Sequence, residues 1–348
     1  MSKRSPISVY SIDKQGNIFD GSGARVFTSI DLFTTLVSQD DICFLCHEKS
    51  IDKEFNQEHV IPNWVQNLCE LNDKYIQLPN KTKFPYKDYK ISCCKECNSF
   101  LGDCYESPIS RAVSKGGDHL SAFLDDGGMW KIFLWMNLIY FKVHLKDNFL
   151  RLNRDRREPD IKIGSLHDWE AMHHCHSLIR AEKFGIPIQI EGALGSTMCL
   201  HLGDWAEKIP FDYNDHIHTH TIFIRCRKIA IICVQNDACG TLQGLEPIID
   251  NLPPDLSQVQ LSELITEFQF VSHNLKNRPE FMTTLIKGSP HIEAIVPNEF
   301  ELNDLEFELR GALMLRNLKA ISPGFKLNGL TPEQSEAAIL KGDVSFIR

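Results

Sequence analysis

The stretch that decides the fold runs between two cysteine couples, Cys43-Phe44-Leu45-Cys46 and Cys94-Lys95-Glu96-Cys97, and contains Glu58-His59-Val60-Ile61-Pro62. Each Cys-x-x-Cys turn presents two sulfurs on one side of a tight loop, so two turns supply the four thiolates of a closed tetrahedral zinc site. Cys93 is an alternative ligand, but Cys94 gives both couples the same turn geometry. The expected ligands of a structural Zn²⁺ are Cys43, Cys46, Cys94 and Cys97.

An acid and a histidine are adjacent inside this stretch, and an asparagine follows the second couple. Hydrolysis of a phosphodiester requires an activated water and a cation that neutralises charge developing on the phosphate. An unperturbed histidine has a pKa of about 6.5, so His59 is largely neutral at pH 7 and able to accept a proton from water. Glu58 and Asn98 offer hard oxygen donors, which favour Mg²⁺ or Mn²⁺ over a second zinc.

Residues 43 to about 106 resemble the zinc-containing branch of the HNH (ββα-metal) endonucleases, whose pattern is Cys-x-x-Cys, Asp/Glu-His-x-x-Pro and Cys-x-x-Cys-His/Asn. The resemblance implies a β-hairpin followed by a helix, with the four cysteines on zinc. It also implies that His59 is the general base and that Glu58 and Asn98 hold a catalytic divalent cation. The family's middle asparagine, which orients the base, has no clear counterpart. The candidates are Asp88, Asn80 and Asn72.

The local pattern predicts short strands at residues 55 to 61 and 89 to 93 on either side of the intervening segment. A helix is expected to begin near Asn98 and to end before Pro108, because proline rarely continues a helix. Glu106 lies a little over two helical turns after Asn98. We expect it to be an exposed helix carboxylate, the alternative being a role at the metal.

Charge separates one segment from the rest of the chain, whose formal net charge of −9 does not suggest a generally basic nucleic-acid surface. The segment from Lys74 to Lys95 contains six lysines and only one acidic residue, and aromatic residues are interspersed among them. Lysines contact phosphates and aromatic rings stack on bases, so this segment predicts nucleic-acid contacts, although an ordinary solvated loop has the same composition. The predicted contacts are Lys81, Lys83, Lys87 and Lys90.

Length and composition predict an ordinary globular protein of two domains, with 348 residues and 43% hydrophobic content. The N-terminus leads into no sustained apolar stretch, so we expect a cytoplasmic protein. Met129 to Phe141 is apolar but too short to span a membrane, and predicts a buried helix that opens the second domain. Seven of the twelve cysteines lie between Cys43 and Cys104, which favours metal binding over disulfides.

The predicted fold class is α+β, with a zinc-clamped ββα-metal (HNH) module joined to a mixed α+β domain. We assign residues 1–40 to an N-terminal extension, 41–115 to the nuclease domain and 120–348 to an accessory domain of unknown role. The accessory domain contains two histidine groups, and for the second a polar or partly buried strand face is favoured, with metal binding or pH sensing as the alternative. They are His173, His174 and His176, and the alternating His216, His218 and His220 of an expected strand. Further elements are expected as helices at 168–184, 256–268 and 301–316 and strands at 221–225 and 228–234.

Three functions are compatible with this pattern. The preferred hypothesis is a metal-dependent endonuclease that hydrolyses phosphodiester bonds, in DNA rather than RNA because the resembling family mostly cuts DNA. The second is a non-catalytic, zinc-dependent module that binds nucleic acid. The third is an antiviral effector nuclease gated by an unknown ligand or protein at the accessory domain. Homo-oligomerisation is left open by the sequence.

Overall fold

The computed structural model describes residues 10–347, which divide by their tertiary contacts into two compact units. Unit 1 consists of residues 10–111, Trp130–Ala193 and Glu280–Ile295, and unit 2 of Ala112–Met129, Leu194–Pro279 and residues 296–347. The units mix helices and strands throughout, in agreement with the expected α+β class. They are not the continuous stretches 41–115 and 120–348 that the sequence suggested, because the chain returns to unit 1 twice.

Unit 1 begins with an antiparallel three-stranded sheet followed by a short helix. The strands β1 (Ser11–Ile12), β2 (Ile18–Phe19) and β3 (Arg25–Phe27) lie in that order. Helix α1 (Ile30–Leu36) comes next. It begins after Ser29, whose side chain caps the helix by accepting a hydrogen bond from the backbone N–H of Leu32.

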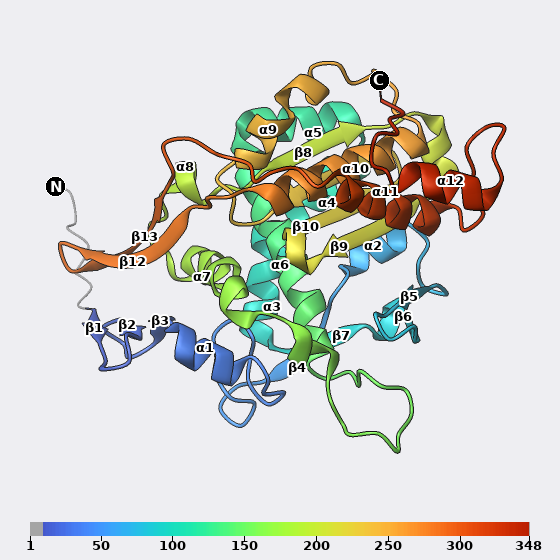
Figure 1. The fold of residues 1–348 in the computed structure, drawn as a ribbon. Helices are drawn as coiled ribbons and strands as arrows, with labels where there is room; N and C mark the ends of the chain where they lie inside the picture. Colours follow the sequence, from blue (N-terminus) through green and yellow to red (C-terminus); the bar gives the residue numbers. More distant parts are fainter. Residues whose placement is uncertain (1–9, 348) are drawn as a thin grey trace. The chain divides into compact units, whose positions relative to one another are not determined.

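The centre of unit 1 is a pair of antiparallel strands that leads directly into a helix (Figure 1). β4 (Phe55–His59) pairs with β7 (Lys90–Cys94), with Phe55 opposite Cys94 and His59 opposite Lys90. The helix α3 (Lys95–Leu101) begins at the next residue. Both strands were predicted to within two residues. The helix starts earlier than the expected Asn98, because the Sγ of Cys94 accepts the N–H of Cys97 and so acts as the cap.

The segment between these strands forms helix α2 (Asn63–Leu68), a small hairpin of β5 (Tyr75–Gln77) and β6 (Lys83–Pro85), and the 3₁₀ turn η1 (Tyr86–Asp88). After α3 the chain makes a π-helical turn, η2 (Gly102–Glu106), and continues as α4 (Ser107–Ser114). The prediction that the helix ends before Pro108 was therefore wrong. Pro108 is the second residue of α4 and directly follows the wider π-helical turn, and the helical path continues through it.

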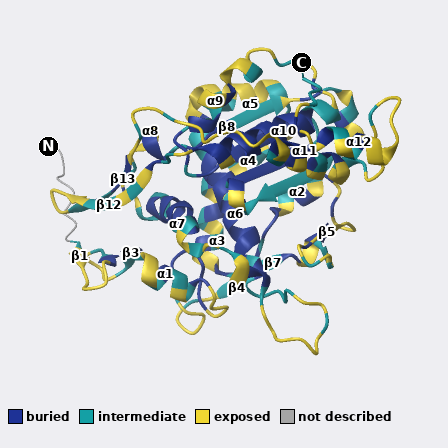
Figure 2. Cartoon of the chain, in the orientation of Figure 1, coloured by how far each residue is buried: buried dark blue, intermediate teal, exposed yellow. Residues whose placement is uncertain are grey.

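Two long helices complete the core of unit 1. α6 (Met129–Asp147) is buried almost along its whole length, which explains the apolar composition seen in the sequence (Figure 2). From Trp130 onward it belongs to unit 1 rather than opening the second domain. α7 (Trp169–Phe184) is capped by Asp168 and ends at Gly185, whose positive φ of 64° suits a glycine.

The remaining elements of unit 1 are short. They are the 3₁₀ turn η4 (Ile163–Leu166), the helix α8 (Ile190–Ala193) and the hairpin of β12 (Glu280–Ile286) and β13 (Ser289–Ile295). Ile188 makes a parallel bridge to Ile292, which attaches the hairpin to the segment before α8.

Unit 2 is built on an antiparallel sheet of four strands in the order β8 (Thr197–His201), β11 (Ile229–Val234), β10 (Thr221–Cys226), β9 (Phe211–His216). Its core joins residues of the two central strands, such as Phe223 and Ile232, to Leu264 and Phe268 of helix α10 (Gln258–Asn274). Further elements are α5 (Gly117–Phe123), η3 (Leu124–Gly128), η5 (Asp204–Lys208), η6 (Ile217–Thr219), α9 (Gly240–Ile249), α11 (Phe307–Ile321) and α12 (Pro332–Ile339).

The histidines at positions 216, 218 and 220 do not alternate along one strand as expected. His216 ends β9, His218 lies in the 3₁₀ turn that follows, and His220 has a left-handed backbone with φ of 51°. The chain turns at this point to pair β10 with β9, and a strand cannot continue through such a turn. The one-sided row of three imidazoles is therefore absent.

Candidate metal centre and the adjoining charged cluster

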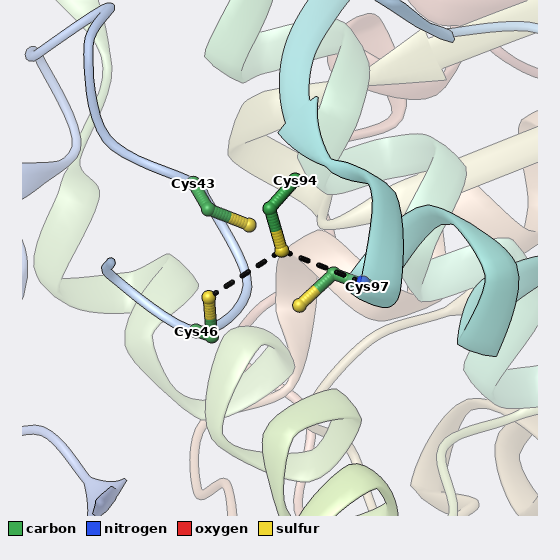
Figure 3. Close-up of side chains that lie close together, drawn as sticks. All are labelled: Cys43, Cys46, Cys94 and Cys97. Atoms are coloured by element: carbon green, nitrogen blue, oxygen red, sulfur yellow. Dashed lines mark hydrogen bonds between the residues drawn. The ribbon is translucent and has the colours of Figure 1, made fainter. Parts of the chain in front are cut away.

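The four predicted cysteines converge in unit 1 (Figure 3). All are buried, and their sulfur atoms lie within 4.8 Å of one another. The Sγ atoms of Cys46 and Cys94 are 3.7 Å apart, close to the separation of about 3.8 Å expected for two thiolates on a tetrahedral zinc with Zn–S bonds of about 2.3 Å. The four side chains are thus positioned to bind a metal ion, and four thiolates fit zinc. Within residues 10–347 this is the one convergence of three or more His, Cys, Asp or Glu side chains close enough to hold a metal.

The choice between Cys93 and Cys94 follows from the direction of the strand. Neighbouring residues of β7 point to opposite faces, so only one of them joins the cluster. The converging set includes Cys94, as predicted, whereas Cys93 approaches Cys43 alone, with 3.8 Å between their sulfurs. Hydrogen bonds with Cys46 and Cys93 lower the pKa of Cys43, while the hydrogen bond with Cys43 raises the pKa of Cys97. Metal binding therefore has to release protons from this site.

Side chains of helix α7 hold the first cysteine couple by hydrogen bonds to the backbone carbonyls of Phe44 and Leu45. The Nε2 of His176 lies 2.7 Å from the carbonyl oxygen of Phe44, and the guanidinium of Arg180 donates to the carbonyls of Leu45 and Arg25. One turn earlier, His173 bonds the carbonyl of Thr28 at 2.7 Å. Burial lowers the pKa of both His173 and His176, so they remain neutral donors. His173 and His176 of the first histidine group are therefore held in hydrogen bonds to backbone carbonyls.

A buried ion pair adjoins the candidate catalytic residues. Lys142 of α6 is fully buried, and its Nζ lies 2.6 Å from Oε1 of Glu58 and 2.7 Å from the carbonyl oxygen of His59. Oε1 of Glu106 lies 3.9 Å from the same Nζ. Glu106 is only 20% exposed, so the expectation of an exposed helix carboxylate was wrong. Burial raises the pKa of Glu106 to about 7, and the neighbouring Glu58 adds to the increase.

Asn98 lies on the same side of the strand pair as Glu58. Its Nδ2 donates to Oδ1 of Asn56 at 2.8 Å, and residues 56 and 58 share one face of β4. This hydrogen bond is made by Nδ2 of Asn98, so it does not involve Oδ1 of Asn98, the atom that would bind a hard cation. Glu58 and Asn98 offer oxygen donors of the type that a divalent cation prefers, but Glu58 already carries the ammonium of Lys142.

His59 is partly buried at the end of β4. Burial lowers its pKa, and the positive charges of Lys90 and Lys142 lower it further, whereas Glu58 opposes the shift. The imidazole is therefore neutral at pH 7, the form that accepts a proton. Lys90, predicted to contact nucleic acid, lies directly opposite His59 in the strand pair.

The three candidates for the orienting asparagine make their hydrogen bonds elsewhere or are exposed. Asn80 donates to the carbonyl of Arg151 at 2.7 Å, Asn72 approaches Asn67 at 3.4 Å, and Asp88 lies exposed in η1. Asn56, which the sequence analysis did not consider, is the polar residue that contacts Asn98. The sequence could have indicated Asn56 by its position two residues before Glu58, since alternate residues of a strand share a face.

The lysine-rich segment is exposed at its charged residues but not at most of its rings. Lys81, Lys83 and Lys87 are exposed and Lys90 is partly buried. Tyr86 and Tyr89 are buried, so the expected stacking on bases is unavailable to them, and Tyr75, 59% exposed, is the ring open to solvent.

The chain matches no family model, no curated protein and no solved structure. The resemblance to HNH endonucleases therefore rests on the sequence motifs of residues 43 to 106. Among the described helices, none is both long and apolar enough to cross a membrane.

Proposed function

We propose that this protein is a metal-dependent endonuclease that hydrolyses phosphodiester bonds in DNA, with His59 as the general base. The observation that carries the proposal is the β4–β7–α3 arrangement beside the four-cysteine cluster, which has Glu58 and His59 at the end of one strand and Asn98 on the helix that follows the partner strand. Four thiolates on zinc fix the start of α3 and the loop before β4, and so hold these side chains in place without taking part in the reaction.

The residues have separate roles in the proposed reaction. His59 accepts the proton of the attacking water at an imidazole nitrogen, which its lowered pKa keeps available at neutral pH. Glu58 and the side-chain oxygen of Asn98 would hold Mg²⁺ or Mn²⁺. A cation there supplies positive charge to the phosphate and to the leaving oxygen. Lys90 and the exposed lysines, Lys81, Lys83 and Lys87, would contact the phosphates on either side of the cut.

A second candidate is a zinc module that binds nucleic acid without cutting it. The pairing of Glu58 with Lys142 favours this alternative, because a carboxylate already neutralised by a buried ammonium attracts a metal ion less strongly. The lysine segment serves both candidates equally.

Cleavage of supercoiled plasmid by the wild-type protein and His59→Ala, each with Mg²⁺, Mn²⁺ or EDTA, separates the two. Equal zinc content is established first, so that a lost fold is not mistaken for a lost base. Metal-dependent cutting that disappears with His59 is the expected result. Retained plasmid binding without cutting by either protein would favour the binding module. A parallel assay with single-stranded RNA shows whether the protein acts on DNA or on RNA.

A further inference from the structure

Lys142 is a charged side chain enclosed in unit 1 with no exposed surface. Its Nζ carries three N–H donors, and Glu58, the carbonyl of His59 and, at 3.9 Å, Glu106 surround it. A lysine is almost never fully buried unless it is paired. This one pairs with the carboxylate that the proposed reaction needs for a metal ion.

Glu106 reaches the cluster through the π-helical turn η2. The N–H of Ser107 bonds the carbonyl of Gly102, five residues earlier, so the turn contains one more residue than an α-helical turn. The extra residue rotates the following side chains about the helix axis relative to those of α3. Turns of this kind are frequent at functional sites, and here the turn ends at Glu106, the second acid beside Lys142.

The cluster combines two acidic side chains with one ammonium. When both acids are ionised, it has one negative charge more than Lys142 compensates, in surroundings where water is largely excluded. The separation of Lys142 and Glu106 exceeds the ordinary hydrogen-bond distance of about 2.8 Å by only about 1 Å. A small movement of the lysine therefore exchanges one carboxylate for the other.

We propose that the ammonium of Lys142 competes with a divalent metal ion for Glu58, and that Glu106 accepts the ammonium when the metal binds. This inference rests on the proposed function only in taking Glu58 as a metal ligand. Lys142 is then a positioning residue: it neutralises Glu58 before the metal arrives and sets the concentration of metal at which the site fills.

The competition is tested by titrating the zinc-loaded, full-length protein with Mn²⁺ in the absence of nucleic acid. Binding is measured as the loss of the EPR signal of free Mn²⁺. Lys142→Met is expected to bind Mn²⁺ at least tenfold more tightly than the wild type, because no ammonium has to be displaced. The control is Lys131→Met, a partly exposed lysine of the same helix, which should leave the affinity unchanged. Unchanged or weaker binding by a folded Lys142→Met protein overturns the proposal.

Glu106→Gln gives a second test that keeps the pair of Glu58 and Lys142 intact, and it decides the matter if Lys142→Met does not fold. It should weaken Mn²⁺ binding at least threefold, because the displaced ammonium loses its acceptor, and unchanged affinity overturns the exchange. In the Lys142→Met background the same substitution should have no effect. Weakening in both backgrounds would make Glu106 a metal ligand and refute its role as acceptor.

The Mn²⁺-binding experiments test the competition separately from the proposed nuclease activity. If Lys142→Met binds Mn²⁺ more tightly but no variant cuts, the competition stands and the proposed nuclease fails. If the wild type cuts and Lys142→Met shows unchanged affinity, the nuclease stands and the competition fails.

Discussion

Arg180 is a buried guanidinium beside the first cysteine couple, and Arg180→Met tests whether the four thiols bind zinc as thiolates. The side chain is 1% exposed and donates to the carbonyls of Leu45 and Arg25. Within the described residues no carboxylate pairs with it. Burial lowers its pKa to about 10, against the opposing effect of the nearby thiols, so it stays charged at pH 7.

Two effects of the substitution oppose each other in the zinc-free protein. The change removes two hydrogen bonds from a charged donor, worth about 1.5–3 kcal/mol each. It also removes a buried charge whose desolvation costs several kcal/mol. The free energy of unfolding without zinc should therefore change little. A zinc bound by four thiolates carries a net charge of −2, so only the zinc-bound protein gains from the guanidinium.

Zinc binding should consequently weaken when Arg180 becomes methionine. Loss of one favourable interaction of about 2 kcal/mol corresponds to a roughly thirtyfold higher Kd. Competition with a chromophoric zinc chelator measures this. The matched control is Arg225→Met in unit 2, which removes an equally buried guanidinium that donates to the carbonyls of Ala206 and Ile209, far from any cysteine couple in the sequence. A zinc Kd for Arg180→Met within twofold of wild type would refute the reasoning.

Three other experiments test the site. Cys94→Ser should release zinc and destabilise unit 1, whereas Cys93→Ser should keep a full equivalent of zinc by elemental analysis, because its sulfur lies outside the converging set. Wild-type cleavage should decline only below pH 6.5 as His59 becomes protonated, since burial lowers its pKa; a loss of rate centred above pH 6.5 would assign the titration to another group. Exchange of the exposed lysines for glutamine should reduce the slope of log K against log salt by up to about 3, and an unchanged slope would make the segment an ordinary surface loop. These lysines are Lys81, Lys83 and Lys87.

The parts of the site that the sequence predicted are those with a local signature. Cysteine spacing located the metal cluster and separated Cys94 from Cys93, since the required turn geometry is set within four residues. The strands β4 and β7 were predicted on either side of the intervening segment, to within two residues. The start of α3 was missed because a cysteine sulfur caps it, and cysteine is not among the usual capping residues.

What the sequence did not predict is the pairing of charges from distant segments. Glu58 and Lys142 are 84 residues apart, and neither has a neighbouring pattern that announces the other. Lys142 comes directly after the apolar stretch Met129 to Phe141, and the sequence analysis gave it no role. Glu106 was misjudged because its direction depends on one π-helical turn, whose single extra residue leaves no recognisable pattern in the sequence.

These long-range contacts change what the nuclease-like segment requires in order to work. The segment 43 to 106 contains the four cysteines and the candidate base, yet the group that neutralises Glu58 comes from α6, and the guanidinium beside Cys43 and Cys46 comes from α7. Each is a buried charge that is stable only with its partner in place. Glu58 without Lys142 would leave a buried carboxylate uncompensated, and Arg180 without the zinc thiolates lacks a negative partner. The metal cluster, the candidate base and the two helices are therefore one electrostatic unit, although the motif is confined to one short segment.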